Sequence, residues 1–316
     1  MKTILVTGSL AFDYIMDYQG IFSDSIMPDK IHTINLSFLL NTLKKERGGT
    51  AGNIAYNLAL LKSKAAIFAA AGNDFGEYEI FLRQKGVDTS NIQIIKDKKT
   101  ASAFIMTDKA DNQITGFYPG AMVHSAHYSL KDVKQKPDFV VISPNDPKAI
   151  SKQSDECREL NVPFMIDMGM QLPSLTSDEI KKILQKATIL IGNDYEISLL
   201  KEKTGLKEEQ ILKNVTILIT TLGVNGSKIQ TAKEAFEIEA AKPKELVDPT
   251  GAGDAYRAGF MSGYESGFDL QTCGQMGAVT ASFAIEKYGT QQHHFTIQAF
   301  QDRYIQTFKD LLELKK

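Results

Sequence analysis

The feature that most constrains the fold is a regular alternation of short apolar runs and amphipathic segments between residues 138 and 220. The runs DFVVIS, PFMID, TILIG and VTILIT are rich in β-branched residues, and the segments between them have helical periodicity, at 146–160, 177–186 and 194–203. Continuous apolar strands that alternate with helices form a parallel sheet covered on both faces. The sequence therefore predicts an α/β fold: a doubly wound, mostly parallel sheet with helices on both faces.

The N-terminal third departs from this alternation. KTILVTG and AAIFAAA are predicted to be buried strands, with helices after Thr50 and across DFGEYEIFLRQKG. Extra strand-like segments occur near residues 13–20, 31–37, 101–107 and 113–118. We expect these to pair antiparallel as a small sheet, a lid over the mouth of the main one. No linker separates two units, so residues 1–316 are predicted to form a single domain, with lid strands from about 13–40 and 100–120 and a mostly helical stretch over the last 65 residues.

Charge and cysteine content exclude several classes of protein. With 36 basic and 38 acidic residues the net charge is −2, which predicts no basic face for nucleic acid or anionic lipid. Cys157 and Cys273 lack metal-type spacing and are predicted to be buried thiols in a reducing compartment. No apolar run approaches the length of a membrane span, and the short apolar start is expected to be a first strand. We expect a cytoplasmic protein without nucleic-acid or membrane partners.

The stretch VDPTGAGDAYRAGF places glycines directly before an aspartate at a predicted helix start. Gly251, Ala252 and Gly253 leave backbone N–H groups unobstructed there, and the helix dipole adds positive character. This predicts an anion cradle suited to a transferring phosphoryl group. Asp254 would repel a phosphate, but it can take the proton of an attacking hydroxyl. An ordinary first-turn helix acid is the alternative interpretation.

Other nucleotide-binding motifs are missing. No G-x-x-x-x-G-K-[ST] occurs, and G-x-G-x-x-G fails at Tyr256. The first strand is followed by GSLAFD, with one glycine, which disfavours a nicotinamide-dependent oxidoreductase. A catalytically silent binding protein is a further alternative, but it would be expected to have lost Asp254 or the cradle glycines.

Two motifs resemble a known family. DPTGAGDAYRAGF is similar to the C-terminal signature of ribokinase-like (PfkB-type) carbohydrate and nucleoside kinases, and RGGTAGNIAYNLALL to their N-terminal signature. The resemblance covers nearly the whole chain and, through TGSLAFDYIM, NQITGFYPGAM and TTLGVNG, is closest to bacterial adenosine kinases. It implies an ATP- and Mg²⁺-dependent kinase that phosphorylates the 5′-hydroxyl of adenosine to give AMP. A sugar kinase of the ribokinase or fructokinase type is the alternative.

The resemblance assigns substrate residues. It implies that Asp13 accepts hydrogen bonds from two ribose hydroxyls, with Ser9, Gly48, Gly49 and Asn53 around the sugar. An apolar base requires aromatic faces. Phe117 in GFYPGAM is the first candidate for stacking on the base. Phe104 is the second, although a one-residue shift of its strand would turn it away from the base. Phe38 is the third.

The nucleotide and ion positions also follow from the resemblance. Asn193 and Glu196 would organise Mg²⁺ through its waters, although their spacing also fits a helix capping box. Thr221, Gly223 and Gly226 would contact ATP, together with Asn193, and Gly289 and Thr290 would close its adenine pocket. Asp248 and Thr250 are candidate ligands of a monovalent cation such as K⁺. Exposed lid edges predict a homodimer through the lid.

Overall fold

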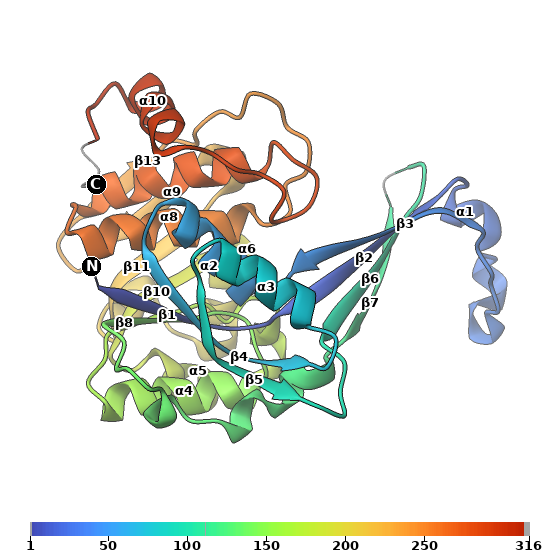
Figure 1. Ribbon diagram of the computed structural model, residues 1–316, viewed down its shortest axis with the longest axis horizontal. Helices are drawn as coiled ribbons and strands as arrows, with labels where there is room; N and C mark the ends of the chain where they lie inside the picture. The colour runs from blue at the N-terminus through green and yellow to red at the C-terminus, as the bar shows by residue number, and fades with distance from the viewer. Residues whose placement is uncertain (1, 111, 313–316) are drawn as a thin grey trace.

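The computed structural model describes residues 2–110 and 112–312. Within these residues a nine-stranded sheet has the order β13-β12-β11-β10-β9-β8-β1-β4-β5 (Figure 1). The seven strands from β11 to β5 are parallel, and β12 and β13 add an antiparallel edge. The strands are β1 (Thr3–Thr7), β4 (Lys64–Gly72), β5 (Asp88–Ile95), β8 (Phe139–Ile142), β9 (Phe164–Ile166), β10 (Ala187–Asn193), β11 (Val215–Thr221), β12 (Ser227–Gln230) and β13 (Ala235–Ile238).

Helices cover both faces of this sheet, as predicted. Alternate strand residues point to opposite faces, so Ile4 and Val6 join one core cluster and Leu5 the other. The first cluster packs under α2 (Thr50–Leu60), α3 (Gly76–Gln84), α8 (Ala252–Ser266), α9 (Leu270–Ala284) and α10 (Ile297–Phe308). The second packs under α4 (Pro147–Glu159), α5 (Ser177–Leu184), α6 (Asp194–Thr204) and α7 (Glu208–Ile211).

The chain reverses its direction of travel across the sheet at β1. Strands β4 and β5 lie on one side of β1, and β8 and its successors lie on the other. Loops at such a point diverge and leave a crevice beyond the carboxyl ends of the strands. The amide of Ser9, after β1, donates to the carbonyl of Pro144, after β8, at 3.0 Å. The topology therefore fixes where a ligand site can form.

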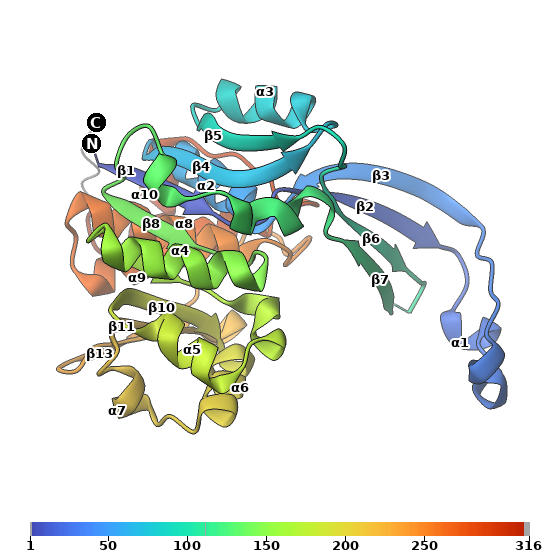
Figure 2. The same ribbon diagram turned by 90° about the horizontal axis from the view of Figure 1, so that it is seen from below.

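A separate four-stranded sheet projects from this edge, in the order β3-β2-β6-β7 (Figure 1). Its strands are β2 (Ala11–Tyr18), β3 (Leu40–Gly48), β6 (Ala101–Thr107) and β7 (Gln113–Tyr118), and we call it the lid. The segment between β2 and β3 carries α1 (Phe22–Ser25) and the 3₁₀ helix η1 (Pro28–Thr33) at the far end of the lid (Figure 2).

The lid corrects two expectations. The predicted strand near 31–37 is wrong, because residues 31–33 end η1 and the third lid strand is β3. Its sequence LNTLKKERG is rich in charge and is buried only at Gly48, so it lacks the apolar alternation that identifies a half-buried strand. Strands β2 and β6 also pair in parallel, whereas the other two pairings are antiparallel. Among the described helices, none combines the length and hydropathy needed to cross a membrane.

Candidate active site

A cavity of about 530 Å³ lies where the lid meets the carboxyl edge of the main sheet. It brings together side chains from β2, α2, β6, β7, α6 and α8, which are far apart in the sequence. The predicted site residues on its wall are Ser9, Asp13, Gly49, Asn53, Phe117, Asn193, Glu196, Thr250, Gly251, Asp254 and Thr290.

The predicted anion cradle forms the start of α8. Gly251 is the N-cap residue and has φ +83°, a left-handed conformation that glycine adopts without strain. The amide of Ala252 donates to the Pro249 carbonyl at 3.2 Å. No backbone carbonyl of the described residues accepts from the amides of Gly253 or Asp254, as expected for the first turn of a helix. These donors can therefore bind an anion.

Asp254 is held by the N-terminal motif. The Asn53 side-chain Nδ2 donates to the Asp254 carboxylate at 2.9 Å, and Asn53 Oδ1 accepts from Gln291 Nε2 at 2.8 Å. Burial raises the pKa of Asp254, while the charge of Arg257 and the hydrogen bond from Asn53 oppose that rise. A raised pKa makes the carboxylate a stronger base, which suits a group that must accept a proton. Asn53 thus orients the proposed base, a role that the sequence did not predict.

Asp13 lies on β2, beside Glu46 of β3. A side chain at Gly48 would overlap the Asp13 carboxylate, so the glycine makes room for it. Burial raises the pKa of Asp13 to about 6, with smaller contributions from the negative charges of Glu46 and Asp248. The structure gives this carboxylate no hydrogen-bond donor among the described residues, which leaves its oxygens available to ligand hydroxyls.

Ser9, which follows β1, lies against Gly49, which precedes α2. Gly49 has φ +86°, and a Cβ there would lie 2.6 Å from the Ala11 nitrogen and the Ser9 carbonyl oxygen. The Ser9 hydroxyl accepts from the Thr50 amide at 3.0 Å. Both residues line the cavity, so backbone atoms form this part of its wall.

The lid strands decide which aromatic residue faces the cavity. Ala103, Ile105 and Phe117 line it, and Ala103 pairs with Phe117 in the β6–β7 register. Successive residues of a strand point to opposite faces of the sheet. Because Ala103 and Ile105 face the cavity, Phe104 between them points away from it. Its ring stacks on Tyr14 on the opposite face of the lid, with centroids 5.0 Å apart. The assignment of Phe104 to the base is therefore corrected.

Phe38, the third aromatic candidate, also lies away from the cavity. Its ring packs edge-on against Tyr18 and Phe22, at centroid distances of 4.7 and 5.3 Å. These contacts hold the segment between β2 and β3 together, so Phe117 is the one predicted phenylalanine on the cavity wall.

Asn193 and Glu196 form a capping box at the start of α6. The Asn193 amide donates to Glu196 Oε2 and the Glu196 amide donates to Asn193 Oδ1, each at 2.8 Å. Both residues line the cavity, and the capping box uses Glu196 Oε2 but not Oε1. Within the described part of the chain, no three His, Cys, Asp or Glu side chains form a metal cage.

The expected ATP residues follow β11, the strand beside β10. Thr221 pairs with Asn193 in the register, so both lie at the carboxyl edge of the sheet. Gly226 has φ +85°, and a Cβ there would overlap the Ile238 carbonyl oxygen. Gly223 also has positive φ but faces open space. These three residues lie outside the enclosed cavity, and their contact with ATP stays a prediction.

Asp248 links two loops at the cavity rim. One carboxylate oxygen accepts from the Thr250 amide and the other from the Gly289 amide, both at 2.9 Å. Thr290 lines the cavity, and its hydroxyl donates to the Arg47 carbonyl at 2.9 Å. Asp248 therefore has a structural role, because its carboxylate holds the two loops together. A monovalent cation at this position stays a prediction.

Two charged cavity residues, Arg257 and Asp167, were missed from the sequence. Arg257, on α8, forms an ion pair with Asp167, which follows β9, at 2.7 Å between Nε and Oδ2. Both side chains are buried, and burial raises the pKa of Asp167 to about 6 although Arg257 opposes it. Arg257 stands inside the DPTGAGDAYRAGF stretch, but a helix position alone does not show that its side chain turns toward the cradle.

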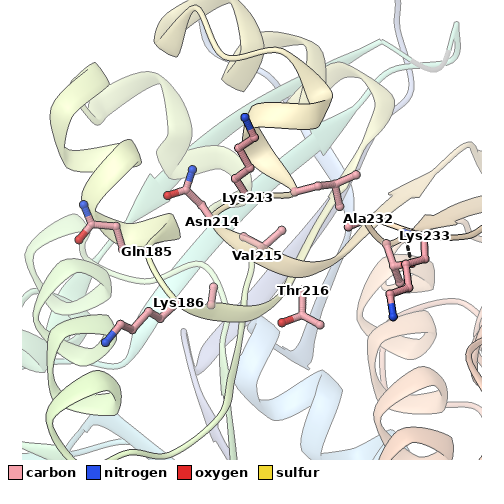
Figure 3. A pocket seen from close by; sticks show the side chains of 11 residues that line it. Gln185, Lys186, Lys213, Asn214, Val215, Thr216, Ala232 and Lys233 are labelled. Atoms are coloured by element: carbon pink, nitrogen blue, oxygen red, sulfur yellow. Dashed lines mark hydrogen bonds between the residues drawn. The ribbon is translucent and has the colours of Figure 1, made fainter.

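A second hollow, of about 720 Å³, opens at the other edge of the sheet, where β10 and β11 begin. Its lysines, Lys186, Lys213 and Lys233, point away from one another (Figure 3). Ligand sites need polar groups that converge. This hollow contains none of the predicted site residues, so the cavity under the lid is the candidate active site.

Comparison with known proteins agrees with this geometry. A profile described as pfkB family carbohydrate kinase matches residues 1–296. The nucleoside kinase of Methanocaldococcus jannaschii is 32% identical over 293 residues, covering 92% of this chain and 93% of that protein. The structure of Burkholderia thailandensis nucleoside kinase in complex with inosine has a TM-score of 0.88 at 33% identity, covering 98% of this chain and 99% of that one. The adenosine kinase of Saccharomyces cerevisiae is 28% identical over 158 residues, 45% of this chain and 46% of that protein.

Proposed function

The chain belongs to the pfkB family of carbohydrate kinases, which transfer phosphoryl groups to hydroxyls, and we propose that its acceptor is the 5′-hydroxyl of a purine nucleoside. The donor is ATP. The observation that carries the proposal is that one cavity is lined by the Asp254 carboxylate and Gly251 of the cradle, by Asp13, and by Phe117 with other apolar residues of the lid.

The reaction uses these groups in order. Asp254 takes the proton of the acceptor hydroxyl as its oxygen forms a bond to the γ-phosphorus of ATP. The bond from that phosphorus to the bridging oxygen of the β-phosphate breaks, and ADP leaves. The first-turn amides of α8 stabilise negative charge on the phosphoryl oxygens during the transfer. Asn53 keeps Asp254 aimed at the hydroxyl through their 2.9 Å hydrogen bond.

The lining of the cavity supports a nucleoside acceptor over a free sugar. Asp13 can accept two hydroxyls of a ribose, while Ala103, Ile105, Phe117 and Met122 offer an apolar wall for a flat base. Adenosine is the acceptor that the sequence favours. Inosine is the ligand in the B. thailandensis nucleoside kinase, which has also been solved in complex with ADP-inosine. We therefore place both purine nucleosides ahead of ribose and fructose.

Mg²⁺ fits the oxygen atoms at the start of α6. Glu196 lines the cavity with one carboxylate oxygen free of the capping box, and Asn193 presents an amide oxygen beside it. Mg²⁺ keeps most of its waters and is commonly bound through one or two carboxylates plus substrate phosphates. When bound there with ATP, it would neutralise charge that develops on the phosphates.

The lid supports a homodimer. Its face opposite the cavity carries Tyr14 and Phe104, and on the same face Leu43 and Ile114 are exposed by 69% and 45%. The outer strands β3 and β7 also leave backbone groups unpaired in a single chain. A second copy that covers this face would bury both features. Sedimentation at micromolar concentration tests the proposal, and a monomer would count against it.

The function is tested with purified protein, ATP and Mg²⁺ against adenosine, inosine, cytidine, ribose and fructose, with ADP release and product mass as readouts. We expect kcat/KM for the purine nucleosides to exceed that for the free sugars by about a hundredfold, the upper range of base stacking. Turnover of ribose as fast as adenosine would refute the nucleoside assignment. Absence of ADP release with every alcohol would refute the kinase itself.

A further inference from the structure

Charge is distributed unevenly in the cavity. Four carboxylates line it, from Asp13, Asp167, Glu196 and Asp254. Among the described residues on its wall, Arg257 is the only basic side chain. A triphosphate donor would add several more negative charges to this cavity. Without a cation from the protein, the phosphoryl group would meet mainly repulsion from the side chains.

The Arg257 guanidinium lies beneath the anion cradle. Arg257 stands one turn after Gly253 on α8, and helical side chains lean toward the N-terminus of their helix. A Cβ built on Gly253 would lie only 2.7 Å from Arg257 Nη1. The guanidinium therefore packs against the α-carbon of Gly253, whose amide has no carbonyl partner among the described residues. The absence of a side chain at Gly253 permits this approach.

Asp167 fixes the guanidinium without occupying its outer edge. The ion pair joins Asp167 Oδ2 to Nε, at 2.7 Å. Within the described chain, Nη1 and Nη2 form no ion pair with Asp167, which contacts Nε alone, and the residue is 7% exposed. Burial acts to lower the pKa of Arg257, but the carboxylates of Asp167, Asp254 and Glu196 outweigh it and raise the pKa. The Arg257 guanidinium is therefore a positioned cation whose Nη atoms can donate to a ligand.

We propose that Arg257 binds the phosphoryl group during transfer, donating from its Nη atoms to the phosphoryl oxygens beside the amides of Gly253 and Asp254. This inference rests on the proposed kinase function and adds a residue to it. Arg257 stays protonated throughout, because Asp254 takes the proton of the hydroxyl and ADP carries away the bridging oxygen. Asp167 is a positioning residue, since it acts by holding the guanidinium.

The test compares Arg257→Gln with a matched control, Arg303→Gln. Arg303 is equally exposed, at 7%, and pairs with Glu286 at 2.9 Å, but it lies on α10 and does not line the cavity. For Arg257→Gln we expect kcat to fall by about 10²–10³, the usual effect of removing one transition-state donor. Arg257→Lys should recover part of the rate, because it keeps the charge but not the planar fork. Arg303→Gln should keep kcat even if its melting temperature falls.

Binding separates this role from a structural one. By calorimetry, Arg257→Gln should bind nucleoside and ADP as the wild type does, and should bind a non-hydrolysable ATP analogue more weakly. Recovery of wild-type kcat at pH 8 to 9 would show that Arg257 acts only by keeping Asp254 ionised, and would overturn the proposal. Loss of nucleoside affinity together with kcat would also overturn it. The variants are assayed with whichever alcohol the wild type phosphorylates, so a failed nucleoside assignment is recognised separately from a failed role for Arg257.

Discussion

The side-chain amide of Asn53 donates a 2.9 Å hydrogen bond to the carboxylate of Asp254, which lies 201 positions later in the chain. Asn53 belongs to the first motif, at the start of α2, and Asp254 to the second, at the start of α8. The two helices pack against each other on one face of the sheet, so their N-termini meet at the same edge. The bond therefore joins the two motifs at the candidate active site.

Asn53→Ala should move the acid limb of the pH–kcat profile to higher pH. The hydrogen bond from Asn53 opposes the rise in the pKa of Asp254, so its loss lets that pKa rise further. Hydrogen bonds to charged groups contribute about 1.5–3 kcal/mol, which corresponds to a shift of about one pH unit or more. Asn57→Ala is the control, because Asn57 is buried one turn later on α2 and does not line the cavity. A limb that moves equally in both variants would contradict the assignment.

Asp254→Asn should remove turnover without unfolding the protein. The amide keeps the shape of the side chain but cannot take a proton, so kcat should fall by about 10²–10⁴. Burial disfavours the charged carboxylate and raises its pKa, so the neutral variant should melt no lower than the wild type at pH 7.5. Calorimetry should show nucleoside binding retained. A variant with more than about a tenth of wild-type kcat would exclude Asp254 as the general base.

Nucleoside affinity should fall as pH drops through about 6. The pKa of Asp13 is raised to about 6, so its carboxylate is ionised above that pH and protonated below it. The ionised form accepts stronger hydrogen bonds from ribose hydroxyls. Titrations with adenosine from pH 5 to 8, without ATP, should show this loss. Asp13→Asn should bind weakly at every pH, and 2′,3′-dideoxyadenosine should show no such dependence. A wild-type affinity that stays constant across this range would remove Asp13 from ribose binding.

Phe117→Ala and Phe104→Ala form a matched pair on neighbouring strands. The two rings are 44% and 43% exposed, but only Phe117 faces the cavity. Phe117→Ala should weaken adenosine binding by about 1–3 kcal/mol, the contribution of a stacked base. Phe104→Ala should leave it unchanged, because that ring stacks on Tyr14 outside the cavity. Equal losses in both variants would mean that the lid acts as a whole and not through a base contact.

Gly49→Ala should destabilise the protein more than Gly86→Ala does. Both glycines have similar positive φ, +86° and +88°. A side chain at Gly86 meets nothing within 4 Å, so only the backbone strain of about 1–2 kcal/mol remains. At Gly49 the new carbon would lie 2.6 Å from backbone atoms of Ser9 and Ala11, which cannot rotate away. Urea denaturation measures the difference, and equal losses would show that the contact with β2 is not rigid.

The sequence by itself determined the features of this protein that depend on residues close together in the chain. The alternation from residue 138 to 220 predicted the parallel sheet and its two helical layers, because strand and helix periods are written in consecutive positions. The string around Gly251 predicted the cradle and the base for the same reason. A helix start, its glycine and its first acid all lie within one turn.

Only the tertiary structure decided which distant side chains meet. Phe104 and Phe117 both stand in plausible lid strands, and strand register alone turns one into the cavity and the other out of it. Strand β3 was misplaced because its charged, exposed sequence carries no apolar alternation to fix its position. The contacts of Asn53 with Asp254 and of Arg257 with Asp167 depend on how whole helices and strands pack. No local pattern encodes such pairings. Each of these residues is compatible with its own helix or strand whether or not its distant partner is present.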